Sequence, residues 1–155
     1  MADYTKPIPG NQSVALTNDV RAASGFTHKF VIKAADMATA ETQSNNDTVT
    51  VNLLKAPAGS IVTRIACRVK TAFTANKVNT YAVGVTAAKT AYLGASNANA
   101  AGILPITGAV ATGRDLSTAT EITAQFTPAT GHKPKDATAG ELEIYLHLVN
   151  LNEVS

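Results

Sequence analysis

Three histidines and eleven acidic residues are the side chains of this 155-residue chain that could perform acid–base or metal chemistry. His28, His132 and His147 lie far apart in the sequence and lack the short spacing of metal ligands. Histidines come close to acids in two places. His132 and Asp136 flank a Pro-containing loop but lack the four convergent ligands expected of a metal site, and Glu141, Glu143 and His147 alternate along one segment. Paired carboxylates can act as acid and base, but a row along a regular strand is typical of a solvated face. We therefore expect no catalytic residues and no enzyme activity.

The other residue types that bind ligands or act as nucleophiles lead to the same expectation. Residues 45–47, NND, resemble a turn and lack the closing glutamate of a calcium loop. Cys67 is the single cysteine, so no intrachain disulfide can form, and its apolar surroundings predict a small buried side chain. The chain has neither a glycine-rich phosphate loop nor the glycine-flanked serine of hydrolases. We expect no metal and no cofactor.

The charges of the chain are sorted by sign along the sequence, although the net charge is only +2. Residues 48–113 contain no Asp or Glu but six basic residues: Lys55, Arg64, Arg68, Lys70, Lys77 and Lys89. Six acids follow: Asp115, Glu121, Asp136, Glu141, Glu143 and Glu153. Separated signs favour pairing with another part of the fold, another copy or a larger assembly. The small net charge and the few aromatic residues among the basic ones argue against nucleic acid as a partner.

The first 25 residues show neither a strand period nor a helical one. Pro7 and Pro9 restrict the backbone to extended conformations, so we expect an extended N-terminal arm over residues 1–25. The chain begins without the apolar core of a secretory signal, and no stretch approaches the roughly 20 apolar residues of a membrane span. We expect synthesis in a cytoplasm and no membrane partner.

Seven short segments alternate apolar and polar residues with a period of two, which is typical of half-buried strands. They cover residues 26–33, 48–54, 61–71, 78–86, 103–107, 120–127 and 141–149. Pro105 interrupts its segment and predicts an edge strand there. Residues 34–42 and 87–102 are predicted to be loops, the latter with a short ordered piece around Tyr92 and Leu93.

These segments predict one all-β domain over residues 26–155, either an antiparallel β-sandwich or a jelly roll. The alternation predicts inward-facing rows in three segments: Phe26, Phe30 and Ile32; Ile61, Ile65, Cys67 and Val69; Leu142, Ile144, Leu146 and Leu148.

The outward rows of two of these segments have opposite charges. Arg64, Arg68 and Lys70 form a basic row, and Glu141 and Glu143 form an acidic row. In one interpretation the two strands are neighbours and the rows pair across the sheet. In the other, the basic row of one copy meets the acidic row of the next, in a head-to-tail contact that closes a ring such as a trimer.

The order of turns and strands between residues 49 and 151 resembles that of head decoration, or cement, proteins of tailed bacteriophages. Five segments carry the resemblance: APAGSIVTRIACRVKTAF, VNTYAVGV, AYLG, TATEITAQFTPATG and AGELEIYLHLVNL. It implies a β-sandwich or jelly roll on the outer surface of an icosahedral head, bound to the major capsid protein and usually a homo-oligomer, often a trimer. It implies no catalysis.

In this role the arm is the candidate contact with a capsid protein or a neighbouring copy. Its candidate contact residues are Tyr4, Lys6, Pro7, Ile8, Pro9, Leu16 and Arg21. The alternative is a receptor- or glycan-binding β module of a phage tail or head fibre. Such modules stack sugars on exposed aromatic rings, and this chain has no Trp and only Tyr145 on a regular outer face.

Overall fold

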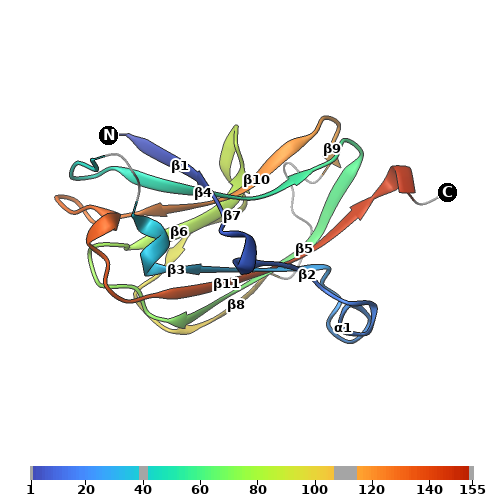
Figure 1. Cartoon of the computed structure of the whole chain (residues 1–155), viewed down its shortest axis with the longest axis horizontal. Coiled ribbons are helices and arrows are strands. Elements are labelled where there is room, and N and C mark those ends of the chain that lie inside the picture. Colours follow the sequence, from blue (N-terminus) through green and yellow to red (C-terminus); the bar gives the residue numbers. More distant parts are fainter. Residues whose placement is uncertain (1, 39–41, 107–114, 154–155) are drawn as a thin grey trace.

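The computed structural model describes residues 2–38, 42–106 and 115–153, and two β-sheets packed face to face form its body (Figure 1). The five-stranded sheet, sheet A, has the order β1 (Asp3–Pro7), β4 (Thr48–Ala56), β10 (Thr120–Thr127), β6 (Thr80–Val85) and β7 (Ala88–Asn97). The other sheet, sheet B, has the order β2 (Ser13–Ala15), β3 (His28–Lys33), β11 (Glu141–Asn150), β5 (Ser60–Thr71) and β8 (Gly102–Ile106). A short strand, β9 (Asp115–Leu116), also pairs with β5. The predicted all-β sandwich is confirmed.

One hydrophobic core fills the space between the sheets, because the strands direct alternate side chains inward. Phe30 and Ile32 of sheet B, and Val49, Val51 and Phe126 of sheet A, are fully buried in it. The edge position predicted from Pro105 is confirmed, since β8 is the last strand of sheet B. The predicted end of that segment at residue 107 lies outside the described residues.

A β-bulge in β5 corrects one predicted inward row. His147 pairs with Arg64 and Leu148 pairs with Val62, so Thr63 is an extra residue in β5. An extra residue reverses the side to which the preceding side chains point. Val62 is therefore buried, whereas Ile61, which was predicted to face inward, is partly exposed.

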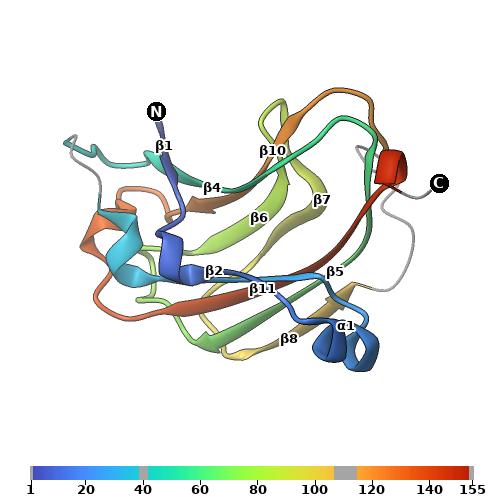
Figure 2. The ribbon, with the colours of Figure 1, turned by 45° about the vertical axis from the view of Figure 1, so that its right-hand side comes forward.

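Residues 2–16 run along the edges of both sheets and do not leave the body (Figure 2). β1 pairs with β4 in parallel, whereas β2 pairs with β3 in antiparallel fashion. Between them, the 3₁₀ turn η1 (Gly10–Gln12) crosses from sheet A to sheet B. The predicted extended conformation holds for these two strands, but the parallel pair makes sheet A mixed and not purely antiparallel.

Side chains of this segment also bond within the chain. The Asp3 carboxylate accepts hydrogen bonds from the hydroxyls of Thr48 and Thr50 at 2.7–2.8 Å. Ile8 packs against the core, and Gln12 Nε2 donates to Asp36 Oδ2 at 2.6 Å. The edges that β1 and β2 cover are therefore closed by main-chain pairing and by specific side-chain contacts.

Two segments depart from the predicted secondary structure. Residues 18–24, which were predicted to be extended, form the helix α1 (Asn18–Ser24), and Gly25 ends it with φ 75°. Residues 88–97, which were predicted to be a loop, form β7. As an edge strand made largely of small residues, β7 does not need the apolar alternation by which strands are recognised.

The remaining helical pieces are short. They are the 3₁₀ turns η2 (Ala34–Met37), η3 (Pro134–Asp136) and η4 (Leu151–Glu153). Asp36 in η2 accepts from the Lys33 main-chain N–H at 2.8 Å, which ties this turn to the end of β3.

We predict that removing residues 2–9 lowers the free energy of unfolding in urea by about 2–4 kcal/mol. The loss combines the packing of Ile8, worth about 1–2 kcal/mol, with several hydrogen bonds worth about 1 kcal/mol each. Thr5→Ala, at an exposed position of β1, is the control and should change stability by less than about 0.5 kcal/mol. An unchanged unfolding midpoint for the truncated protein would contradict the structural role of β1.

Candidate interaction surface

The residues suspected of chemistry do not converge. In the described part of the chain, no group of three or more His, Cys, Asp and Glu side chains could hold a metal ion. His132 Nδ1 lies 3.0 Å from Lys77 Nζ, and His147 Nδ1 contacts the Thr63 hydroxyl. Cys67 is buried as predicted, and burial raises the pKa of its thiol to about 12, which leaves it unreactive at neutral pH. Among the described residues, no helix is long and apolar enough to cross a membrane.

The strongest polar cluster lies on the outer face of sheet B and centres on Glu143. Its Oε2 accepts from Lys29 Nζ at 2.8 Å and from the Tyr145 hydroxyl at 2.6 Å. Its Oε1 accepts from Arg68 Nε at 3.0 Å and also from Arg68 Nη2. Three adjacent strands, β3, β11 and β5, therefore meet at one carboxylate. These donors cover Glu143 so well that its side chain is 1% exposed.

This burial corrects the prediction that Glu143 belongs to a solvated face. Burial alone acts to raise the pKa of Glu143, but the hydrogen bonds from Lys29, Tyr145 and Arg68 outweigh it and lower that pKa to about 2. The same contact with Glu143 raises the pKa of Lys29. The carboxylate is therefore ionised at neutral pH and cannot act as a general acid.

The two charged rows pair within the chain, as the first of the two interpretations supposed. β5 and β11 are neighbours, with Arg68 opposite Glu143 in the register. Lys70 Nζ lies 3.5 Å from Glu141 Oε1. Arg64 has a different contact, since its guanidinium carbon lies 4.8 Å from the centre of the Phe26 ring. The head-to-tail contact between copies stays a prediction, but the acids proposed for it already have partners.

An apolar pocket of about 280 Å³ lies beside this cluster on the outer face. Its lining residues are Ser24, Phe26, Ala66, Cys67, Arg68, Ile103 and Tyr145. Phe26 and Tyr145 tilt toward each other with ring centres 5.8 Å apart, and Ile103 at the β8 edge is 67% exposed. We call this pocket, together with the flanking Arg64 and Lys29, the outer-face surface.

The end of α1 positions Phe26 on this surface and not in the inward row predicted for it. Gly25 takes the left-handed conformation that ends the helix, three residues before β3 begins at His28. A Cβ atom at Gly25 would lie 2.4 Å from Arg64 Nη1, so glycine also leaves room for Arg64 to cover the Phe26 ring.

Sequence reasoning missed Phe26, Lys29 and Ile103 as members of one surface. Phe26 follows the same two-residue spacing as Phe30, and only the helix before it reveals that it lies outside the strand. Ile103 is an apolar residue in a short apolar segment, so its sequence gives no sign that its side chain is exposed.

The predicted contact residues of the arm are mostly engaged within the chain. The Tyr4 hydroxyl donates to the Thr42 carbonyl at 2.8 Å, and Lys6 Nζ donates to the Ala38 carbonyl at 3.2 Å. Pro7 is exposed and Arg21 lies on the exposed side of α1. Pro9 and Leu16 are partly buried. That these residues contact a capsid protein or a second copy stays a prediction.

No protein-family model and no curated protein matches this chain. One solved structure aligns over 96% of this chain and 100% of its own: Aeromonas hydrophila PliG, a periplasmic lysozyme inhibitor of g-type lysozyme. The sequence identity is 13% and the TM-score is 0.38, and a likeness of this size carries no argument about function.

We predict that Glu143→Gln lowers the free energy of unfolding at pH 7 by about 2 kcal/mol, because Lys29 and Arg68 lose their shared anion. The folded pKa lies below the value of an unfolded glutamate, so the stabilisation is complete above about pH 4.5 and is lost as the pH falls toward 2. Urea unfolding between pH 7 and pH 2.5 should therefore show a steeper loss for the native protein than for the variant.

The matched control is Glu141→Gln, which breaks the more exposed pair with Lys70. It should change stability by less than about 0.5 kcal/mol. Equal effects of the two substitutions would show that Glu143 has no special role.

Proposed function

We propose that this protein is a decoration protein of a tailed-bacteriophage head, which binds the outer surface of the assembled capsid and stabilises it by bridging capsid subunits. The strand-and-turn pattern of residues 49–151 supports the proposal, as does the sandwich fold. The cluster at Glu143 links three strands beneath the outer-face surface. A surface held rigid in this way suits the binding of another protein more than it suits catalysis.

The observation that carries the proposal is the outer-face surface itself. Ile103 is 67% exposed and lies beside an apolar pocket. Together they form a continuous exposed apolar area, and such areas are typical of surfaces that a partner covers. Arg64 and Lys29 lie over the Phe26 and Tyr145 rings, so cations flank the apolar area. The surface therefore suits a capsid patch with apolar residues at its centre and acidic residues at its rim.

Preference for assembled subunits explains how such binding would stabilise a shell. A ligand that binds the assembled state and not the dissociated one shifts the equilibrium toward assembly. We further propose a homo-oligomer, with a trimer as the expected form, because linked copies bind a repeating lattice more tightly than single copies do. The place of action would be the virion surface, after synthesis in the host cytoplasm.

The glycan-binding alternative has less support. Tyr145, its candidate stacking residue, has Lys29 Nζ 5.6 Å from its ring centre and Phe26 tilted against it. Its hydroxyl is held by Glu143. A sugar ring would have to displace these neighbours to stack flat on the tyrosine.

We predict that Ile103→Asp reduces occupancy on heads that lack the protein at least tenfold, because it places a charge in the apolar centre of the interface. Occupancy is measured by co-sedimentation of purified heads with the purified variant. Val14→Asp is the matched control, since Val14 is 47% exposed on β2 at the opposite edge of sheet B.

Both variants must retain the native circular dichroism spectrum and melting temperature. Full occupancy by Ile103→Asp would exclude the outer-face surface as the contact. Absence of head binding by the native protein would refute the decoration role.

A further inference from the structure

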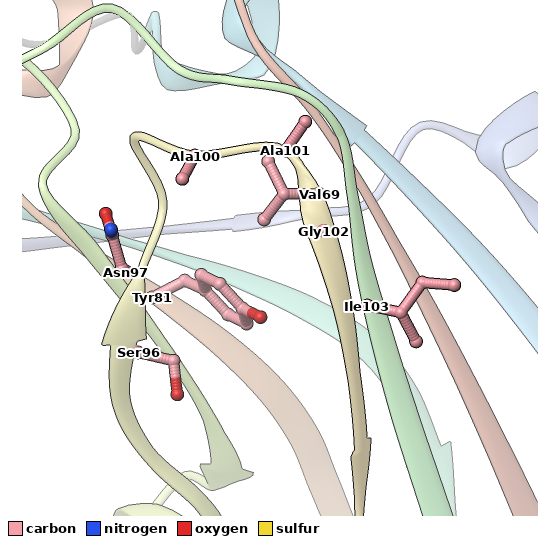
Figure 3. A pocket seen from close by; sticks show the side chains of 8 residues that line it. All are labelled: Val69, Tyr81, Ser96, Asn97, Ala100, Ala101, Gly102 and Ile103. Carbon is pink, nitrogen blue, oxygen red and sulfur yellow. The ribbon is translucent and has the colours of Figure 1, made fainter.

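A second pocket lies where the chain passes from sheet A to sheet B on the side opposite the N-terminal segment. It has a volume of about 370 Å³ and lies between the end of β7 and the start of β8 (Figure 3). Its lining residues are Val69, Tyr81, Ser96, Asn97, Ala100, Ala101, Gly102 and Ile103. Both β7 and β8 are edge strands. This pocket shares Ile103 with the outer-face surface but does not include its Phe26, Tyr145 or Arg68.

The lining of this second pocket has two chemical properties. None of its residues carries a charge, and most of its side chains are small or apolar. Its polar side chains are Ser96, Asn97 and Tyr81. The Ser96 hydroxyl donates to the Gly94 carbonyl and Asn97 Oδ1 accepts from the Asn99 main-chain N–H, whereas the Tyr81 hydroxyl is buried and has no hydrogen-bond partner among the described residues. Tyr81 as a whole is 1% exposed. A buried hydroxyl without a partner costs stability, which makes this group unusual in a folded protein.

The hydroxyl faces the space between the two edge strands. In Figure 3 the Tyr81 ring lies beside the strand of Ser96 and Asn97, and its oxygen is directed toward the strand of Gly102. Burial raises the pKa of Tyr81, so the hydroxyl keeps its proton and acts as a donor. Because bulk water is excluded from it, an acceptor that enters the pocket gains more than it would at the surface.

We propose that this second pocket binds an uncharged, extended peptide segment of the partner, with a main-chain carbonyl accepting from Tyr81 and a small apolar side chain against Val69 and Ala101. The identity of the partner as the capsid protein rests on the proposed function. The peptide chemistry rests on the buried hydroxyl of Tyr81 that lacks a partner in the described part of the chain, on the uncharged lining and on the two sheet edges beside it, where an extended segment can pair through its main chain. Charged groups are disfavoured because nothing in the lining compensates their desolvation.

The test uses a blocked tripeptide, N-acetyl-Ala-Val-Ala N-methylamide, titrated into the isotopically labelled full-length protein and followed by NMR. We expect saturable shifts in the amides of residues 96–102. The same peptide with Glu in place of Val should bind more weakly. Tyr81→Phe should weaken the binding of the Val peptide about five- to tenfold, the effect of losing one hydrogen bond.

Two further variants separate a lost donor from a disturbed fold. Tyr92→Phe removes the hydroxyl of another buried tyrosine, outside the pocket lining, and should leave peptide affinity unchanged. Ala100→Leu, at an exposed position, should reduce affinity by narrowing the pocket while the core stays intact. Without peptide, Tyr81→Phe should melt at a higher temperature than the native protein, because it removes a buried polar atom that lacks a partner.

The proposal is overturned if no saturable shifts occur at residues 96–102, if Tyr81→Phe binds as tightly as the native protein, or if the Glu peptide binds equally well. These measurements need no capsid, so their failure leaves the decoration role to the head-binding experiment. Conversely, if the protein binds the peptide but does not bind purified heads, the pocket is a peptide-binding site and the capsid is not its partner.

Discussion

The carboxylate of Glu143 is the interaction on which the outer face of sheet B depends. It collects donors from Lys29 on β3, Arg68 on β5 and Tyr145 on β11 at a site that solvent barely reaches. Loss of any one of these donors leaves the buried charge less compensated and is therefore destabilising. The carboxylate holds Arg68 and Tyr145, which line the adjacent apolar pocket, and Lys29, one of the two cations that flank it.

The closure of the two sides of the sandwich is the second constraint. The first strand of sheet A and the first strand of sheet B are consecutive in the sequence, and so are the last strands of the two sheets, β7 and β8. On the first side, a 3₁₀ turn and hydrogen-bonded side chains fill the crossing. On the second side, the crossing leaves a pocket with a buried donor, so the two sides differ in their capacity to accept another chain.

Much of the fold was predictable because most core strands alternate apolar and polar residues over most of their length. The segments at residues 120–127 and 141–149 were placed correctly, because their apolar residues recur at every second position. Three features escaped for physical reasons. Thr63 gives no sign of a bulge, β7 is too poor in large apolar residues to show a period, and the helix at residues 18–24 is too short for an apolar stripe.

The candidate site was less predictable than the fold. The opposite charges of Arg68 and Glu143 suggested their pairing, but burial of the acid also depends on Lys29 from the neighbouring strand β3 and on Tyr145, two residues further along β11. Sequence alone cannot distinguish an exposed ion pair from one covered by an aromatic ring. The exposure of Ile103 likewise depends on the position of β8 at the sheet edge, which is a property of topology and not of local pattern.

The position of β11 has a consequence for how the molecule comes to be folded. This strand is the last in the sequence, yet it lies in the middle of sheet B, between β3 and β5. Similarly, Asp3 of β1 can pair only after Thr48 of β4, 45 residues later in the sequence, has been synthesised. A chain with many contacts between residues far apart in the sequence folds slowly. Sheet B cannot be completed until β11, which ends at Asn150, has left the ribosome. Folding is thus a late, concerted event, and a nascent chain would present no finished binding face to a partner.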